Sequence, residues 1–377
     1  MSLLSDYVKQ KGALEIWNKY FVDSLEDEFR DKCLDGIDCV RLTKESFIVE
    51  NKCREILSRV DNPFVIGGKF ALNYLKENFG LELNGNVVCL ETSGDDLRRF
   101  IDEIKNYDCI VGVGGGHVMD LLKFLGMKTG KKTLAIPTTL TTHVYASPKI
   151  HAGNAIASFG YKKTIDGSPP TVALIDKKLI LPLQKKSPRL IFTGLGDISA
   201  YVTAVEDWRL AEKNGKDKVN DYVVEMTKDT IDEIMKIDIN EDLDGWLERY
   251  CLIQVTLCNI TDWVGSAPAS GAEHLFAKSL EEINGNILHG EAVALGIIIV
   301  SHLQGKNEGL AENLVRHIGL DVSSSHGYSW KDVALALYNG REKGLLKDRF
   351  TVLEEKKLSL DECEKFILHL VDKGVLK

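Results

Sequence analysis

The chain has 377 residues, of which 44% are apolar and 27% charged, and its formal net charge is −9. This length allows two domains with separate cores, and the apolar content is that of an ordinary globular protein. The acidic balance argues against a nucleic-acid partner, which requires a basic face, but a few local lysines can still bind a small anionic substrate.

The eight cysteines are scattered, and no two of them form a CxxC pair. Cys89 and Cys109 stand in apolar runs and are interpreted as small core residues. The opening residues include Asp6 and Lys9, so no secretory signal is predicted. The longest apolar run, around residues 292–300, is too short to cross a bilayer. These features predict a reduced, cytoplasmic protein without a membrane span.

Short apolar runs alternate with amphipathic stretches in the first half of the chain. Residues 1–60 predict two helical pieces and a short strand near 46–49. The elements expected after them are strands at 63–68, 86–91, 109–113, 133–137 and 171–176, and helices at 70–78, 95–106 and 117–127. Ser93 is expected to cap the helix at 95–106. The alternation predicts a parallel sheet with crossover helices.

The second half is predicted to be helical. Residues 141–170 are irregular and predict a loop or hairpin that returns through the strand at 171–176. The helices expected beyond residue 180 lie at 198–213, 219–235, 244–262, 268–283 and 290–304. We therefore predict an α/β dinucleotide-binding domain over residues 1–180 and a helical metal-binding domain over residues 181–377. A cleft between two such domains is a natural active site.

A glycine-rich turn, Gly114-Gly115-Gly116, joins the predicted strand at 109–113 to the helix that follows. Glycines let the backbone approach a pyrophosphate, and the helix start offers free N–H groups. The turn is not a GxGxxG fingerprint, and a purely structural turn is the alternative. Glu91, at the end of the preceding strand, could accept hydrogen bonds from a ribose and favour NAD over NADP, with a solvated loop glutamate as the alternative.

Three dispersed side chains, Asp197, His274 and His289, are the candidate metal ligands. One carboxylate and two imidazoles leave coordination positions open on a divalent ion, as the polarisation of a substrate oxygen requires. The two histidines flank a turn at 282–286, which is compatible with two antiparallel helices. Asp197 follows glycines and precedes an amphipathic stretch, so a helix N-cap is its competing interpretation.

These motifs together resemble the superfamily of iron-containing alcohol dehydrogenases, glycerol dehydrogenases and 3-dehydroquinate synthases. The resemblance rests on the glycine turn, Pro137-Thr138-Thr139, Gly194-Leu195-Gly196-Asp197, His274 and Leu288-His289-Gly290-Glu291. Within that superfamily the chain is most similar to the sn-glycerol-1-phosphate dehydrogenase family. This second likeness is carried by Thr203-Ala204-Val205, Asp207-Trp208-Arg209-Leu210-Ala211 and the stretch Ser270 to His274. The resemblance spans roughly residues 60–300.

The resemblance implies a dehydroquinate synthase-like fold, with an N-terminal Rossmann-like domain and an all-helical C-terminal domain. It implies a divalent metal, usually zinc, on Asp197, His274 and His289. The residues that it implies for binding NAD(H) or NADP(H) are Gly114, Gly115, Gly116, Asp120, Thr138 and Thr139. Members of this family are commonly homo-oligomers.

The chain departs from the family at His143, which replaces an aspartate that helps to hold the polyol hydroxyls. A neutral imidazole cannot supply the two acceptor oxygens of a carboxylate, so the substrate need not be plain dihydroxyacetone phosphate. His143 is the candidate for orienting the substrate or relaying a proton. Lys149, with Lys162 and Lys163 after it, could bind a phosphate, and a solvated basic loop is the alternative.

The predicted function is NAD(P)-linked reduction of a keto phosphate to a polyol phosphate, such as sn-glycerol 1-phosphate, with the metal acting as a Lewis acid on the carbonyl oxygen. The first alternative is a sugar-phosphate cyclase of the 3-dehydroquinate synthase type. That family carries a glutamate where Asp197 stands, and a double glycine where Ser147-Pro148 stands. The second alternative is an inactive nucleotide-binding relative, which His143 favours and the complete ligand trio opposes.

Overall fold

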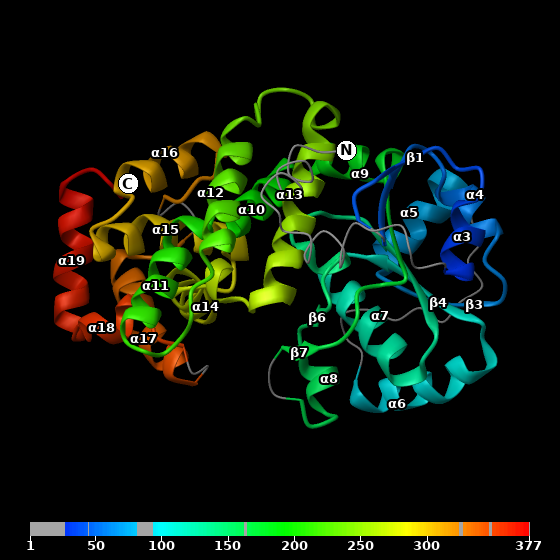
Figure 1. Ribbon diagram of the computed structural model, residues 1–377, viewed down its shortest axis with the longest axis horizontal. Helices are drawn as coiled ribbons and strands as arrows, with labels where there is room; N and C mark the ends of the chain where they lie inside the picture. The colour runs from blue at the N-terminus through cyan, green and yellow to red at the C-terminus, as the bar shows by residue number, and fades with distance from the viewer. Residues whose placement is uncertain are drawn as a thin grey trace. The chain divides into compact units, whose positions relative to one another are not determined.

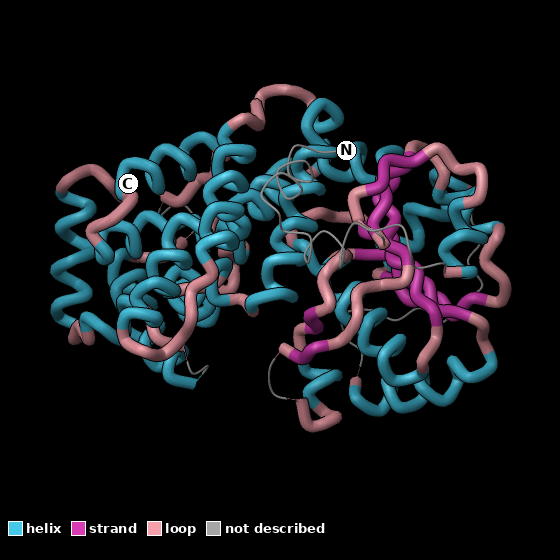
Figure 2. The backbone as a smooth tube through the Cα atoms, viewed as in Figure 1, coloured by secondary structure: helices cyan, strands magenta, loops and turns pink. Residues whose placement is uncertain are grey.

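The computed structural model describes residues 27–43, 45–80, 93–161, 164–323, 327–346 and 349–376. The chain forms two compact units. The first comprises Met1–Pro188 and Gln254–Asp262, and the second comprises Arg189–Ile253 and Trp263–Lys377. Figures 1 and 2 show that the described strands belong to the first unit and that the second is built from helices.

The first unit contains a six-stranded sheet of order β1-β2-β8-β5-β4-β3. Its strands are β1 (Cys39–Arg41), β2 (Ser46–Val49), β3 (Pro63–Gly67), β4 (Cys109–Gly114), β5 (Lys132–Pro137) and β8 (Val172–Asp176). All neighbours are parallel except β1, which pairs antiparallel with β2. Every residue of β2, β4 and β8 is buried, as in a sheet covered on both faces. The predicted parallel sheet is confirmed, whereas the strand expected at 86–91 lies outside the described residues.

Helices surround this sheet (Figure 1). They are α3 (Glu28–Leu34), α4 (Cys53–Ser58), α5 (Lys69–Phe79), α6 (Gly94–Glu103), α7 (Gly116–Thr129), α8 (Asn154–Ala157) and α9 (Lys177–Lys186), with the 3-10 helices η1 (Ile104–Asn106) and η2 (His143–Tyr145). Ser93 caps α6 as expected, through a capping box with Asp96. Leu75 of α5, Val111 of β4 and Leu174 of β8 belong to one buried core cluster.

The expected hairpin is present in the segment between β5 and β8. β6 (Lys149–Ile150) pairs antiparallel with β7 (Ile165–Asp166). Lys123, on α7, donates from Nζ to the carbonyl oxygens of Ser147, at 3.1 Å, and Lys149, at 2.5 Å. Its ammonium is buried, so these bonds attach the hairpin firmly to the helix that follows the glycine turn.

The second unit is helical. Its helices are α10 (Pro188–Ile198), α11 (Tyr201–Lys213), α12 (Asp221–Met235), α13 (Leu243–Val264), α14 (Ala272–Ile283), α15 (His289–Gln304), α16 (Glu308–His317), α17 (Trp330–Leu346), α18 (Val352–Lys356) and α19 (Leu360–Asp372), with the 3-10 helix η3 (Ala267–Ala269). Residues 254–262 of α13 group with the first unit. α15 is central, because nearly all its residues are buried, and α14 packs against both α15 and α17.

The helix predicted at 198–213 is confirmed as α11, which starts at Tyr201 and ends at Lys213. Ile198 instead ends α10. Gly194 and Gly196, which precede Asp197, lie inside α10, a helix that was not among those expected from the sequence. Among the described helices, none combines the length and the apolar character needed to cross a bilayer.

Candidate metal centre and dinucleotide site

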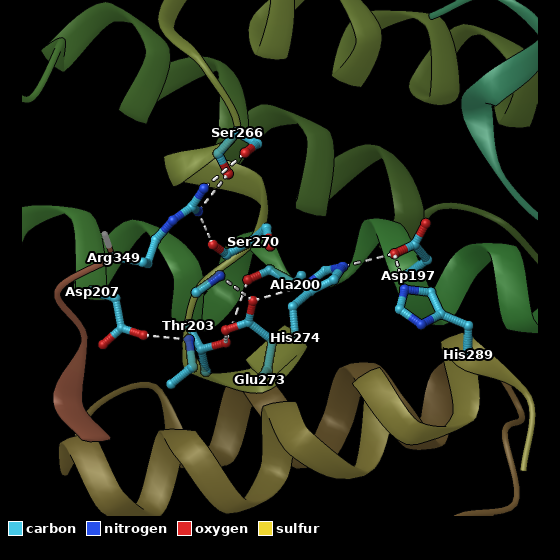
Figure 3. A network of polar contacts seen from close by, with 12 residues as sticks. Asp197, Ala200, Thr203, Asp207, Ser266, Ser270, Glu273, His274, His289 and Arg349 are labelled. Carbon is cyan, nitrogen blue, oxygen red and sulfur yellow. Dashed lines mark hydrogen bonds and ion pairs between the residues drawn. The ribbon is translucent and has the colours of Figure 1, made fainter. Parts of the chain in front are cut away.

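Asp197, His274 and His289 meet within the second unit. Asp197 is the penultimate residue of α10, His274 lies in the first turn of α14, and His289 is the first residue of α15. Asp197 Oδ1 lies 3.0 Å from His274 Nε2 and 3.5 Å from His289 Nε2. One candidate ligand atom from each residue lies within 4.8 Å of the others. Figure 3 shows both imidazole rings directed at the Asp197 carboxylate.

Two interpretations of Asp197 were open, and its surroundings distinguish them. The residue before α11 is Ala200, and no side chain caps that helix. Asp197 therefore does not act as an N-cap. Its buried carboxylate is instead engaged by the two imidazoles. The geometry thus leaves Asp197 available to the same ion as the two histidines.

Two further carboxylates orient the rings. His274 Nδ1 lies 3.0 Å from Glu273 Oε1, and His289 Nδ1 lies 2.5 Å from Glu281 Oε1. A carboxylate on Nδ1 fixes the tautomer and leaves Nε2 to face an ion. One carboxylate oxygen and two Nε2 atoms form a donor set that zinc, iron, manganese and nickel all accept. The residues present therefore fit a divalent transition metal.

The electrostatics of this cluster favour positive charge. Burial alone would raise the pKa of the Asp197 carboxyl. Hydrogen bonds from His274 and His289 outweigh burial and hold that pKa well below its usual value. Burial alone would lower the pKa of His289, but Asp197 and Glu281 raise it to about 10. The pKa of Glu273 is also lowered, because its hydrogen bond with His274 and further donors outweigh its burial. With neutral imidazoles the cluster would carry surplus negative charge, which a dication neutralises.

The two helices that carry Asp197 and His289 touch through glycines. A Cβ at Gly196 would lie 2.3 Å from the Gly290 carbonyl oxygen, and one at Gly290 would lie 1.7 Å from the Thr193 carbonyl oxygen. Each glycine is the chain neighbour of a candidate ligand. The glycines thus permit the close approach of α10 and α15 on which the Asp197–His289 contact depends.

An ion pair between the exposed Arg189 and the buried Glu291 joins the same two helices. The Arg189 guanidinium, at the start of α10, donates to both carboxylate oxygens of Glu291 in α15, with Nη2 lying 2.6 Å from Oε2. Glu291 is 2% exposed, and its Oε2 also accepts a bond from the Leu288 amide at 3.0 Å. A two-pronged arginine–carboxylate pair fixes direction as well as distance. It holds His289, two residues from Glu291, against α10.

The glycine turn of the first unit lies at the carboxyl edge of the sheet. Gly114 ends β4, Gly115 precedes α7, and Gly116 is the first residue of that helix. The Thr138 amide, just after β5, donates to the Gly114 carbonyl at 3.0 Å, and a Cβ at Gly115 would lie 3.3 Å from Thr139 Oγ1. No side chain caps α7. Five of the predicted cofactor residues are therefore close together at a helix start suited to a phosphate.

Comparison with known proteins places the chain in a family. Residues 82–182 match the family model of iron-containing alcohol dehydrogenases. A glycerol-1-phosphate dehydrogenase (NAD(P)+) from Methanococcus aeolicus is 30% identical over 339 residues, which cover 84% of this chain and 94% of that protein. Another, from Methanococcus maripaludis, is 30% identical over 319 residues, which cover 79% and 89%. The chain belongs to the glycerol-1-phosphate dehydrogenase family. The resemblance predicted from the motifs is confirmed.

Solved structures support the predicted fold of this family member. A probable glycerol dehydrogenase from Sinorhizobium meliloti has a TM-score of 0.62 at 17% identity, covering 87% of this chain and 96% of that one. A maleylacetate reductase from Agrobacterium tumefaciens has a TM-score of 0.61 at 13% identity, covering 88% and 97%. Identities this low show the shared fold, and the predicted fold class is confirmed.

Asp120 is the sixth cofactor residue that the family resemblance implies. Its carboxylate forms a buried ion pair with Lys123. Its Oδ1 lies 3.3 Å from Lys123 Nζ, and the His151 backbone amide donates to its carboxylate. Burial raises the pKa of Asp120, and Lys123 opposes that rise. In this structure Asp120 therefore joins α7 to the start of the hairpin. Glu91, the predicted ribose contact, lies outside the described residues.

The two predicted catalytic residues lie on the segment after β5. His143 opens η2 and is half-buried, and its carbonyl oxygen lies 3.4 Å from Cys258 Sγ. Lys149 lies in β6, and its ammonium forms an ion pair with Asp166 across the hairpin. The positive charge of Lys149 is thus matched within the hairpin. Lys162 and Lys163 lie outside the described residues.

Asp207 of α11 belongs to a motif that carries the family resemblance, but it was not predicted as a site residue. Its buried carboxyl belongs to the same polar network as the candidate metal ligands (Figure 3). Its Oδ2 accepts the Ala272 amide at 2.7 Å, and its Oδ1 accepts the Val352 amide and Gln304 Nε2, each at 2.9 Å. Burial and the charge of Glu273 raise the pKa of Asp207 to about 7, against these hydrogen bonds. Asp207 therefore ionises near neutral pH.

This raised pKa predicts a pH-dependent stability. Because the folded value of about 7 exceeds the usual 3.8, folding favours the protonated form. The contribution of Asp207 is fully present below the unfolded value and is lost as pH rises to about 7. Between pH 5 and pH 8, the free energy of unfolding of the wild type should fall by about 2–3 kcal/mol relative to Asp207→Asn. Urea unfolding of both proteins at several pH values measures this, and parallel pH curves would contradict it.

Proposed function

We propose that this chain is a metal-dependent, NAD(P)-linked oxidoreductase that reduces a keto phosphate of the dihydroxyacetone phosphate type to a polyol phosphate such as sn-glycerol 1-phosphate. The observation that carries the proposal is the convergence of Asp197, His274 and His289 from three helices. The substrate class comes from the names of the two Methanococcus relatives, and the uncapped helix after the glycine turn supports the dinucleotide.

The residues around the cluster have distinct tasks in this proposal. Asp197 Oδ1 and the two Nε2 atoms would hold the cation, and Glu273 and Glu281 orient the two rings. A bound divalent ion supplies a Lewis acid that polarises a carbonyl oxygen and stabilises the charge on it during hydride transfer. Three protein ligands leave a position open for that oxygen. Zinc as the occupant and a homo-oligomeric assembly stay predictions.

In the first unit, the chain's backbone does most of the proposed binding. The amides that open α7 would bind the pyrophosphate of NAD(H) or NADP(H), because the helix start carries partial positive charge. Thr138 and Thr139 offer hydroxyl groups beside this turn. His143 is proposed to orient the substrate in place of the family aspartate.

The test is turnover with and without metal. Purified protein is stripped with a chelator, dialysed and assayed for oxidation of NADH and of NADPH with dihydroxyacetone phosphate. We expect the rate to fall to background and to recover when zinc, iron, manganese or nickel is added back. Full turnover by protein that elemental analysis shows to be metal-free would contradict the role proposed for the three ligands.

The same assay separates the alternatives. Release of inorganic phosphate from a sugar-acid phosphate, without net oxidation of NADH, would replace the proposal with a cyclase. Binding of NADH with no turnover of any keto phosphate or sugar phosphate would indicate an inactive relative. We do not expect the cyclase, because Asp197 stands where that family carries a glutamate. We do not expect an inactive relative, because the ligand trio is complete and is supported by two further carboxylates.

A further inference from the structure

Arg349 lies in the segment before α18 and makes hydrogen bonds to the segment that leads into α14. Its Nη1 donates to the carbonyl oxygens of Ser266, at 3.2 Å, and Ser270, and its Nη2 donates to Ser266 Oγ at 2.8 Å. All these acceptors lie in one five-residue stretch, 266–270. Figure 3 shows this guanidinium at one end of a polar network whose other end is the metal cluster.

Each residue between Ser270 and His274 makes a hydrogen bond with a neighbouring side chain. The Gly271 amide donates to Glu273 Oε1 at 2.6 Å, and the Ala272 amide donates to Asp207 Oδ2 at 2.7 Å. Glu273 Oε2 accepts the hydroxyl of Thr203 at 2.8 Å. The next side chain is His274, whose Nδ1 faces Glu273 Oε1. The orientation of His274 thus depends on where this stretch of backbone lies.

The stretch has little room to shift. A Cβ at Gly271 would lie 2.7 Å from Asp207 Oδ2 and 3.0 Å from the Ala204 Cα of α11. A charged guanidinium that bonds neutral backbone oxygens loses its hydration without the gain of a full ion pair. Burial accordingly lowers the pKa of Arg349, against the charges of Glu273, Asp217 and Asp207. The hydrogen bonds of Arg349 therefore fix the position of the backbone at residues 266–270.

We propose that Arg349 is a positioning residue of the metal centre: it fixes the Ser266–Ser270 stretch and, through Glu273, sets the orientation of His274. Asp207 is a second anchor, because it accepts the amide of Ala272, which lies between that stretch and His274. The inference rests on the proposed function in one respect, that His274 is a metal ligand. Arg349 acts through the backbone and does not contact the ion.

The cavity beside Arg349 makes a sharp test possible. It has a volume of about 220 Å³, and its lining includes Asp207, Trp208, Lys216, Arg349 and Phe350. Lys216 is exposed, so the cavity reaches solvent. When Arg349 is shortened to alanine, the space left by the guanidinium adjoins this cavity. A small guanidinium ion added to the buffer can therefore reach the vacated carbonyl oxygens.

The experiment compares Arg349→Ala and Arg349→Lys with Arg341→Ala, a control that removes an ion pair to Glu354 in the same unit. Metal affinity is measured by competition with a chelator, and hydrogen exchange of the metal-free proteins is followed over residues 266–275. We expect Arg349→Ala to weaken metal binding by about 10-fold, the lower end of the loss seen when a direct partner of a ligand is removed, because Arg349 acts through the backbone. Exchange over 270–274 should rise in the same variant, and kcat with dihydroxyacetone phosphate should fall.

Replacement of Arg349 with lysine, or a guanidinium ion added to Arg349→Ala, should restore part of the lost metal affinity. Arg349→Lys can still donate to one or two of the carbonyl oxygens, so its affinity should lie between those of the wild type and Arg349→Ala. Ethylguanidinium, added to Arg349→Ala at millimolar concentration, should tighten metal binding and leave Arg341→Ala unchanged. If Arg349→Ala does not fold, Arg349→Lys must still show weakened affinity and faster exchange.

Separate outcomes identify which idea fails. A wild type that binds none of zinc, iron, manganese and nickel would refute the proposed function. The hydrogen-exchange data would still show whether Arg349 fixes residues 266–270. A wild type that binds metal, with variants of unchanged affinity and unchanged exchange, would overturn the positioning role. Equal losses in Arg349→Ala and Arg341→Ala would overturn it too, because they would reflect general destabilisation.

Discussion

Replacement of Asp197 with asparagine is expected to weaken divalent-metal binding by more than about 100-fold, because loss of a residue that only orients a ligand already costs about 10–100-fold. The amide keeps the shape of the side chain and removes its negative charge. In the folded chain this charge is shared by His274 and His289, whose Nε2 atoms lie 3.0 and 3.5 Å from the same oxygen. The remaining pair of imidazoles would be two neutral ligands on a cation, and turnover should fall to background.

The measurement is metal content after dialysis, together with turnover of dihydroxyacetone phosphate in excess metal. The matched control is Asp221→Asn, which neutralises an exposed carboxylate in the first turn of α12. It should keep wild-type metal content and rate. Wild-type metal binding by Asp197→Asn would mean that the ion is held by other residues.

The sheet of the first unit was predictable because its strands are continuous apolar runs. Residues 109–113 and 133–137 have few local alternatives, since burial on both faces selects unbroken hydrophobic stretches. α10 was missed for the opposite reason. Gly194 and Gly196 disfavour a helix locally, and the helix forms where Gly196 lets the backbone meet Gly290 of α15. Packing against α15, rather than local helix propensity, therefore determines that α10 is a helix.

The candidate ligands could be selected from their motifs, but their supporting groups could not. Glu281 and Glu282 are neighbours in one helix and look alike in sequence. In the folded chain Glu281 faces His289, whereas Glu282 pairs with Lys343 of α17. Lys149 illustrates the same limit, because its partner, Asp166, comes from the other strand of a hairpin. Which charges are matched depends on contacts between distant segments, and local spacing does not encode them.

Gly290→Ala is expected to destabilise the protein by about 3 kcal/mol or more, at or above the upper end for overpacked cores. The new Cβ would lie 1.7 Å from the Thr193 carbonyl oxygen and 2.5 Å from its carbon. Both atoms belong to the backbone of α10, so no rotamer change relieves the clash. The helices must separate, and Arg189–Glu291, which links them in a fixed geometry, would be stretched.

The sign of the effect is what makes Gly290→Ala diagnostic. Glycine to alanine within a helix normally stabilises, by roughly 0.5–1 kcal/mol. Gly309→Ala in α16, where a Cβ meets nothing within 4 Å, is the matched control and should show that gain. Denaturant unfolding of the two variants should therefore move in opposite directions. Metal affinity should fall only in Gly290→Ala, because separation of α10 from α15 carries Asp197 away from His289. Equal stability changes in the two variants would mean that these helices do not meet through their glycines, and the Asp197–His289 contact would lose its structural basis.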